Sequence, residues 1–347
     1  MYHSHNEIFT QGESLQKTWD FVTEQKDKIR DFFASADYDE IVFVACGSSY
    51  WLSMSACMTW QAMTNKRCSA IKSGDILLEP DYYSRACIRP LFIIPSRSGR
   101  TSETLLALDL LQKWYAAAPV FALVVYEDSQ LEARADFSVK LPWANEISIC
   151  QSRSLSNIYT AAIMAADAIA GDGTLTRELA EYIADFETYS PAAETLIKQI
   201  MAEMPNCKAL ISLGAGRQYG LAIAGAYVTL EMSQLPCHYY GLLEYRHGPI
   251  VLADSDYLIS IIGGRHLNGY DEKLATDARK SGAKVLGITS GSPLAGVDYK
   301  AVVPKAVSKE VLSLYGVFIL QGFAYYKACA LGVNPDAPGE LTPFIEI

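Results

Sequence analysis

Short apolar runs alternate with longer amphipathic stretches along most of the chain. The run at 41–45 is rich in β-branched residues and too short for a helix, which is typical of a buried parallel strand. Further runs of this kind lie at 91–95, 120–125, 137–141, 209–213, 257–262, 285–288 and 301–303. Helical patterns lie between them, as at 13–33 and 51–64. The alternation predicts the α/β fold class, with doubly wound parallel sheets in three α/β/α layers and ligands at the carboxyl ends of the strands.

One strand–turn–helix pattern occurs twice, about half a chain apart. The first copy has Cys46-Gly47-Ser48-Ser49-Tyr50 after its strand, and the second has Gly214-Ala215-Gly216-Arg217-Gln218-Tyr219. A helix of small residues follows in each case, so we infer an internal duplication of one α/β unit. We expect an N-terminal helical segment at 1–34, a first domain at 35–172, a helical connector at 173–204, a second domain at 205–333 and a tail at 334–347.

The most informative stretch is rich in hydroxyl groups and runs from Ser96 to Thr104, between an apolar run and an amphipathic one. The first N–H groups of a helix have no partner and its N-terminus is electropositive, so an anion is favoured in front of it. Gly99 allows a close approach of the backbone, and Arg97 and Arg100 add positive charge. Hydroxyl groups also serve as ordinary helix caps. Their density here, beside a glycine, predicts a site for the oxygens of a phosphate monoester.

The second half of the chain lacks this feature at the corresponding place. Its turn reads Ile262-Gly263-Gly264-Arg265-His266 and contains no hydroxyl group. We therefore expect only the first domain to hold a phosphate.

Two residues of the second half are candidates for proton transfer. His247 lies in a His-Gly-Pro loop, where an imidazole can titrate near neutral pH and reach a ligand. Glu231 lies toward the end of a helix of small residues, between Leu230 and Met232, and a carboxylate in such surroundings can abstract a proton. The alternatives are an exposed or structural histidine for His247 and a solvated helix position for Glu231.

Charge and composition exclude several classes of function. The net charge of −10 argues against a nucleic acid or an anionic membrane as the main partner. The eight cysteines form no C-x-x-C pair, which favours a reduced cytoplasmic protein over a disulfide framework or a zinc site. Neither a signal peptide nor a membrane span is predicted. We expect no cofactor, because the sequence contains no dinucleotide fingerprint, metal-ligand spacing or pyridoxal-type lysine site.

Several motifs together resemble the tandem sugar isomerase (SIS) domain family. They are Cys46-Gly47-Ser48-Ser49-Tyr50, Ser96-x-Ser98-Gly99-x-Thr101-x-Glu103-Thr104, Gly214-x-Gly216-x-Gln218-Tyr219 and Glu244-x-x-His247-Gly248-Pro249. The match runs over nearly the whole chain, and its layout is similar to the isomerase half of glucosamine-6-phosphate synthase. The resemblance implies two SIS domains, a sugar 6-phosphate as ligand, and a homodimer or higher homo-oligomer.

The resemblance also implies roles for individual residues. The phosphate and the substrate would be held by Gly47, Ser48, Ser49, Ser96, Arg97, Ser98, Gly99, Thr101, Gln151 and Glu244. Glu231 would shuttle a proton between C1 and C2 of the sugar, and His247, supplied by the neighbouring subunit, would assist ring opening. Arg97 stands where the relative has a glutamine, and Gln151 stands where it has a serine.

Two positions depart from the synthase-like pattern. A lysine three residues before the matching glutamate is replaced by Val228, and a lysine near the C-terminus is replaced by Pro343. An amine able to form a Schiff base with an open-chain ketose is thus missing at both positions. The fructosamine-6-phosphate deglycase branch of the family also keeps the glutamate and the histidine without that lysine, because the nitrogen of its substrate can supply the iminium.

The sequence therefore predicts an enzyme that acts on a hexose 6-phosphate bearing nitrogen at C1 or C2. It would be a fructosamine-6-phosphate deglycase or an amino-sugar-6-phosphate deaminase or isomerase. A plain aldose–ketose isomerase, with the same base and no C–N cleavage, stays open as an alternative. So does a non-catalytic phosphosugar sensor, although sensors of this family usually join one SIS domain to a DNA-binding helix-turn-helix.

Overall fold

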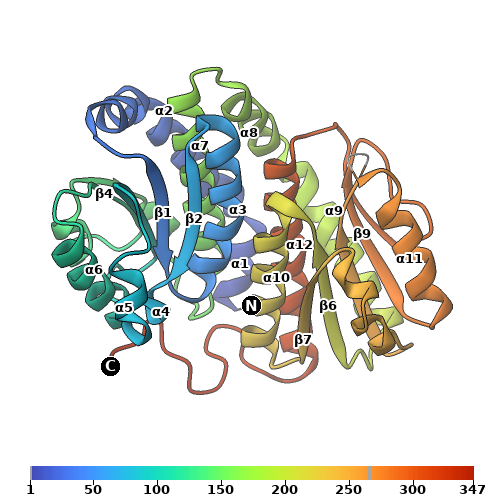
Figure 1. Cartoon of the computed structure of the whole chain (residues 1–347). Coiled ribbons are helices and arrows are strands. Elements are labelled where there is room, and N and C mark those ends of the chain that lie inside the picture. Colours follow the sequence, from blue (N-terminus) through green and yellow to red (C-terminus); the bar gives the residue numbers. More distant parts are fainter. Residues whose placement is uncertain (1, 265–266) are drawn as a thin grey trace. The chain divides into compact units, whose positions relative to one another are not determined.

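The structure, a computed structural model, describes residues 2–264 and 267–347 (Figure 1). Its contacts divide the chain into two compact units. The first unit consists of Glu13–Glu146, Arg153–Glu181 and Thr342–Ile347, and the second consists of the N-terminal residues up to Gly12, Ile147–Ser152 and Tyr182–Leu341. No helix within the described residues is both long enough and apolar enough to span a membrane.

The first unit contains a parallel five-stranded sheet with the strand order β2-β1-β3-β4-β5. Its strands are β1 (Glu40–Ala45), β2 (Arg67–Lys72), β3 (Pro90–Ser96), β4 (Val120–Val124) and β5 (Phe137–Lys140). The strands β1, β3 and β4 are buried at every position, because helices cover both faces of the sheet. The edge strand β2 is only partly buried.

Helices form the outer layers of this unit. They are α2 (Gln11–Ser35), α3 (Gly47–Thr64), α4 (Ser73–Leu78), α5 (Pro80–Tyr83), α6 (Ser102–Trp114), α7 (Arg153–Ala170) and α8 (Thr174–Ala184). On one face of the sheet, Leu108 of α6 belongs to the same buried cluster as Ile94 of β3. On the other face, the ring of Phe33 in α2 lies 5.1 Å from Phe121 and 5.0 Å from Trp60 in α3. Large apolar side chains thus fix both outer layers to the sheet.

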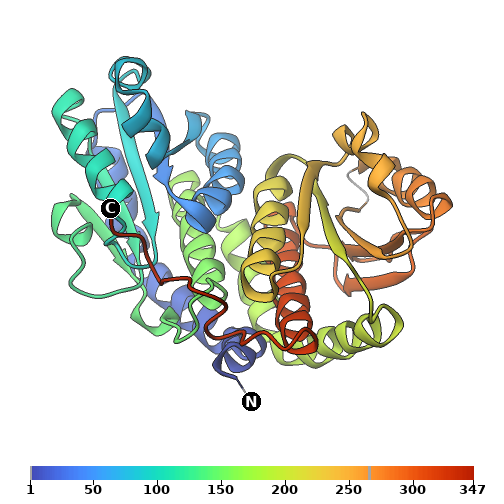
Figure 2. The same ribbon diagram turned by 90° about the horizontal axis from the view of Figure 1, so that it is seen from below.

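The second unit repeats this architecture. Its sheet is also parallel and five-stranded, with the order β10-β9-β8-β6-β7. The strands are β6 (Ala209–Gly214), β7 (Cys237–Gly241), β8 (Tyr257–Ile262), β9 (Lys284–Ser290) and β10 (Tyr299–Val303). Read in reverse, this order is β7-β6-β8-β9-β10, which matches the order β2-β1-β3-β4-β5 of the first sheet strand by strand. The predicted fold class, two similar parallel sheets between helical layers, is confirmed (Figures 1 and 2).

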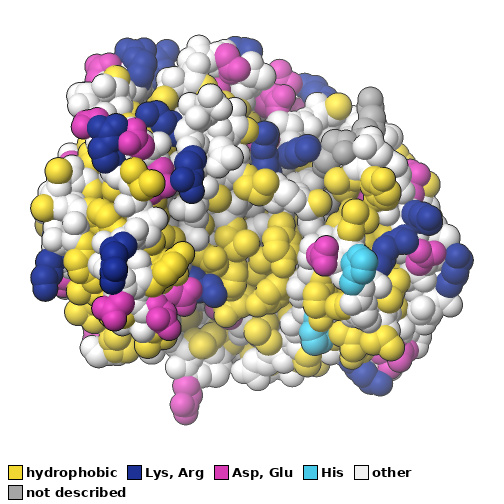
Figure 3. All heavy atoms as spheres, viewed as in Figure 1, with side chains coloured by type: hydrophobic (Ala, Val, Ile, Leu, Met, Phe, Trp, Pro, Cys, Tyr) yellow, Lys and Arg dark blue, Asp and Glu magenta, His cyan; other side chains and the backbone are white. Residues whose placement is uncertain are grey.

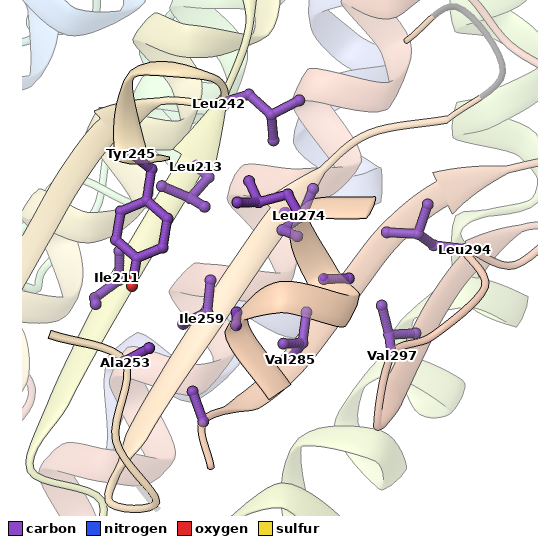
Figure 4. Close-up of a cluster of buried hydrophobic side chains, with 14 residues drawn as sticks. Ile211, Leu213, Leu242, Tyr245, Ala253, Ile259, Leu274, Val285, Leu294 and Val297 are labelled. Carbon is purple, nitrogen blue, oxygen red and sulfur yellow. The ribbon is translucent and has the colours of Figure 1, made fainter. Parts of the chain in front are cut away.

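The helices of the second unit also cover both faces of its sheet. They are α1 (His3–Phe9), α9 (Phe186–Glu203), α10 (Tyr219–Ser233), α11 (Tyr270–Lys280) and α12 (Lys309–Ala330). Leu274 of α11 packs in a buried cluster with Ile211 and Ile259 of the sheet (Figure 4). The helices α10 and α12 lie very close to each other, since a Cβ atom at Gly225 would lie 2.3 Å from a methyl group of Leu320.

Candidate functional site

The turn between β3 and α6 brings the hydroxyl-rich segment to the carboxyl end of a central strand. Ser96 Oγ accepts a hydrogen bond from the N–H of Gly99 at 3.0 Å, and Ser98 Oγ accepts one from the N–H of Arg100 at 3.1 Å. Both serines are almost fully buried. Because each hydroxyl accepts from its own turn, its O–H remains the donor toward a ligand. Thr101 is the N-cap residue of α6, but its side chain does not cap that helix.

Gly99 suits this turn for two separate reasons. Its φ is +58°, in the left-handed region that favours glycine. A Cβ atom at this position would also lie 2.4 Å from the Oγ of Ser129, which is closer than non-bonded atoms can approach. The shape of the turn therefore depends on glycine at this position.

A second hydroxyl-bearing turn lies next to the first, because β1 and β3 are neighbouring parallel strands. It joins β1 to α3 and places Gly47, with a φ of +50°, Ser48 and Ser49 in the first turn of that helix. The Sγ of Cys46 lies 3.5 Å from the Oγ1 of Thr104, and this contact links the two turns. Burial raises the pKa of the Cys46 thiol, so the thiol is neutral and does not repel an anion.

The two turns together form a site with the chemistry of an anion binder. The N-termini of α3 and α6 meet at one edge of the sheet, and neither has a side-chain cap. Four buried serines lie at this edge: Ser48, Ser49, Ser96 and Ser98. Helix N-termini favour an anion through their N–H groups and their dipoles, and hydroxyl groups add further donors. We call residues 47–49 and 96–101 the serine edge.

Arg97 belongs to the same turn, but its side chain is part of an internal ion pair. The guanidinium lies 3.0 Å from the carboxylate of Glu146 and donates a second hydrogen bond to the carbonyl of Pro343 at 2.7 Å. The hydroxyl of Ser154 donates to the same carboxylate. The Arg97 charge is therefore compensated within the protein. The sequence predicts that the Arg97 side chain contacts the phosphate. In the structure it instead forms an ion pair with Glu146 inside the protein.

The last residues of the chain lie over the start of α6. The N–H of Ser102 donates to the carbonyl of Ile345 at 3.0 Å, and the N–H of Ile347 donates to the hydroxyl of Ser102 at 3.2 Å. Figure 2 shows the C-terminus beside this helix. These bonds, together with the contact between Arg97 and Pro343, fix the tail next to the serine edge. Nothing in the local sequence pattern indicated this contact.

The corresponding turn of the second unit, which follows β8, is closed by a carboxylate. The Oδ2 of Asp271 accepts a hydrogen bond from the N–H of Gly264 at 2.7 Å, and a Cβ atom at Gly263 would lie 2.5 Å from the same oxygen. Asp271 lies in the first turn of α11, so its own charge occupies the place that would suit an anion. Arg265 and His266 of this motif lie outside the described residues.

Glu231 lies near the end of α10 and is half-buried. Tyr227 precedes it by one helical turn, and this spacing puts the two side chains on the same helix face. The pKa of Tyr227 is raised first by burial and then by the Tyr239 phenol and the Glu231 carboxylate, so these groups lie near one another. Glu231 is thus a carboxylate beside phenol groups. Sequence reasoning missed Tyr227, although its helical spacing from Glu231 could have indicated it.

His247 follows the short 3₁₀ helix η4 (Glu244–Arg246), and both it and Glu244 are exposed. The loop is anchored by Tyr245, which is completely buried with Leu213 and Leu242 (Figure 4). Figure 3 shows histidine side chains on the surface of this unit. The buried anchor therefore holds a loop whose titratable groups face outward, just beyond the carboxyl end of β7.

The other predicted positions differ in their surroundings. The side-chain oxygen of Gln151 is buried and has no hydrogen-bond partner among the described residues. Val228 is buried in α10, and an apolar side chain thus occupies the position of the family lysine. Within residues 2–264 and 267–347, no three His, Cys, Asp or Glu side chains gather as metal ligands would.

Comparison with known sequences gives one family match and a set of long relatives. The family model described as the SIS domain matches residues 203–328. The chain is similar to isomerizing glutamine–fructose-6-phosphate aminotransferases, with 27% identity to that of Clostridium acetobutylicum and 24% identity to that of Vibrio cholerae. These matches cover 98% and 100% of this chain but only 58% and 59% of the relatives. The chain therefore spans less than two thirds of their length.

Comparison with solved structures gives matches over almost the whole chain. Glucosamine-6-phosphate deaminase from Thermotoga maritima has a TM-score of 0.77 and 26% identity, over 95% of this chain and 99% of that chain. Tagatose-6-phosphate ketose/aldose isomerase from Escherichia coli has a TM-score of 0.80 over 99% of this chain and 95% of that chain; its 17% identity shows the fold alone. Residues 203–328 are thus similar to the SIS domain family, and both units have parallel α/β sheets like those of the solved structures that the chain resembles.

Proposed function

We propose that the serine edge of the first unit binds the phosphate group of a hexose 6-phosphate. The observation that carries this proposal is the meeting of two helix N-termini without side-chain caps and four buried serines at one edge of a sheet. A protein with a net charge of −10 needs such local donors to hold a phosphate. Fructose 6-phosphate, glucosamine 6-phosphate and tagatose 6-phosphate occur in the names of its relatives, which supports the same ligand class.

We further propose an enzyme that acts on a hexose 6-phosphate with nitrogen at C1 or C2, with Glu231 as its base. Glu231 takes a proton from one of these carbons and returns it to the other, through an enolamine. Water then adds to the resulting imine and the amine leaves, so that the C–N bond breaks and a carbonyl forms. His247 opens the sugar ring by exchanging a proton with the ring oxygen.

Two observations support a substrate that carries nitrogen. Relatives are named as an aminotransferase and as a deaminase of amino-sugar phosphates. Val228 occupies the position of the family lysine, so under this proposal the substrate supplies the iminium nitrogen. The protein would act as a cytoplasmic homodimer in which His247, exposed in the single chain, serves the neighbouring subunit.

A plain aldose–ketose phosphosugar isomerase is the second candidate. The similarity in fold to tagatose-6-phosphate ketose/aldose isomerase favours it. The base is the same in both candidates, and only the products differ. Amine release and isomer formation, measured on the same preparation with fructosamine 6-phosphate and fructose 6-phosphate, distinguish them.

The Glu231→Gln variant tests the proton transfer, because it removes the base and keeps the size of the side chain. We expect kcat to fall by about 10²–10⁴-fold while the Kd of the substrate stays unchanged. The measurement is the exchange of solvent deuterium into C1 and C2 of glucosamine 6-phosphate and fructose 6-phosphate. The Glu187→Gln variant changes an exposed carboxylate of the same unit and should keep the rate of the wild type. Near-normal exchange by Glu231→Gln would refute the assignment.

A further inference from the structure

Lys327 is a buried lysine in the second unit. It lies in the last turn of α12, and only 1% of its surface is exposed. Within the described residues, no carboxylate pairs with its ammonium group and no hydrogen bond engages it. A buried charge without a partner is unusual, because loss of hydration destabilises it. The residue therefore indicates a partner that is not part of the polypeptide.

Lys327 lines an open pocket of about 600 Å³, which we call the cavity. The cavity lies at the amino end of the second sheet, next to Lys208 before β6, Gln234 before β7 and Asp256 before β8. The loop that carries His247 follows the carboxyl end of β7, so it lies at the opposite end of the same parallel sheet. The cavity is thus separate from the His247 loop.

The charges around this cavity favour an anion. Lys208 and Asp256 form an ion pair at 2.6 Å, so the acidic group is already compensated. Burial raises the pKa of the neighbouring Cys207 thiol and the charge of Lys327 opposes that rise, which places the lysine charge close to a neutral thiol. The dipole of α12 favours a positive charge at the C-terminal end of the helix, where Lys327 lies, but a dipole does not neutralise that charge. Lys327 remains as the uncompensated charge among the described lining residues.

We propose that this cavity is a second ligand site, which binds a small organic anion through Lys327. The ligand carries a carboxylate or phosphate group that pairs with the ammonium, and a polar remainder that hydrogen-bonds the amides of Asn206 and Gln234. The volume suits a metabolite better than a single inorganic ion. The cavity lies in the second unit and the serine edge in the first, so the two ligand sites share no residue.

The Lys327→Met variant tests this site, since it keeps the length of the side chain and removes the charge. Calorimetric titration with succinate and with inorganic phosphate measures binding. We expect at least one of these anions to bind the wild type and to bind the variant about tenfold more weakly or worse. Without added anion, the variant should have the higher Tm, because it buries no unpaired charge. Added anion should close this gap by stabilising the wild type.

The Lys300→Met variant is the matched control, because it removes an exposed lysine of the same unit and should bind like the wild type. The serine edge is unchanged in Lys327→Met, so phosphate bound there contributes equally to the wild type and the variant. A difference in binding between these two proteins therefore reports on the cavity. Weaker binding of succinate would identify a carboxylate ligand, and weaker binding of phosphate would identify a phosphate ester. The proposal is overturned if both anions bind Lys327→Met as tightly as the wild type, or if neither binds the wild type.

Discussion

The ion pair between Arg97 and Glu146 positions three segments around the serine edge. The two side chains are 3% and 0% exposed, so each charge depends on the other for compensation. Glu146 stands shortly before α7, and Arg97 also binds the carbonyl of Pro343 in the tail. The serine turn, the segment before α7 and the tail are thus tied to one guanidinium. We assign Arg97 a positioning role on this basis.

Loss of the Arg97 charge should destabilise the first unit. The Arg97→Met variant leaves the Glu146 carboxylate buried without a cation, which we expect to lower the unfolding free energy by about 3–5 kcal/mol. The double variant with Glu146→Gln should recover a large part of this loss, since no charge is then left unpaired. Thermal unfolding of the three proteins measures both effects. A Tm of the single variant equal to that of the wild type would contradict the role of the pair.

Individual site residues could be predicted where the local chain positions them. The hydroxyls of Ser96 and Ser98 are held by N–H groups two or three residues away, so the sequence of the turn contains the information. The partner of Arg97 lies 49 residues away, and no local pattern relates the two. The sequence therefore places Arg97 in the turn but does not indicate that its side chain pairs with Glu146.

At the scale of elements, the central strands and the edge strands β5 and β10 could be predicted, whereas the edge strands β2 and β7 could not. The strands β1, β3 and β4 are continuously buried and hence continuously apolar. The strands β2 and β7 lie at sheet edges, are only partly buried and have no comparable apolar run. The helices α3 and α6 begin earlier than their apolar patterns indicate, because hydroxyl-bearing residues form their first turns.

The turn between β3 and α6 should not tolerate a side chain at Gly99. The Gly99→Ala variant combines a φ of +58° with a contact of 2.4 Å to Ser129, and the left-handed backbone alone costs about 1–2 kcal/mol. We expect the affinity for fructose 6-phosphate, measured by calorimetric titration, to fall at least about tenfold. The double variant with Ser129→Gly removes the clash but not the strain, so it should recover only part of the affinity. Unchanged affinity of Gly99→Ala would show that this turn does not hold the phosphate.

At the scale of the molecule, one architecture occurs twice and only one copy keeps the serines. Both sheets have the same strand order, yet Asp271 closes the turn of the second unit where serines line that of the first. Acidic and basic side chains are interspersed on the face seen in Figure 3. The duplication could be predicted because it repeats a pattern in the sequence. The closure of the second turn by Asp271 could not be predicted, because it depends on a contact across the turn.

A site shared between subunits predicts complementation between two inactive proteins. Under the proposed function, Glu231→Gln and His247→Ala are each inactive as homodimers. In an equal mixture that exchanges subunits, half of the dimers are mixed and each has one intact site, so about a quarter of the wild-type activity should return. The measurement is turnover before and after mixing, with self-mixed variants as controls. A mixture that exchanges subunits and stays inactive would show that both residues act within one chain.

The central claim is that the serine edge holds the phosphate of the sugar. A crystal structure of the chain with bound fructose 6-phosphate tests it most directly. We predict that the phosphate oxygens lie within hydrogen-bond distance of the Ser98 hydroxyl and of the first N–H groups of α3. A sugar phosphate bound elsewhere, with the serine edge occupied only by water, would contradict the account.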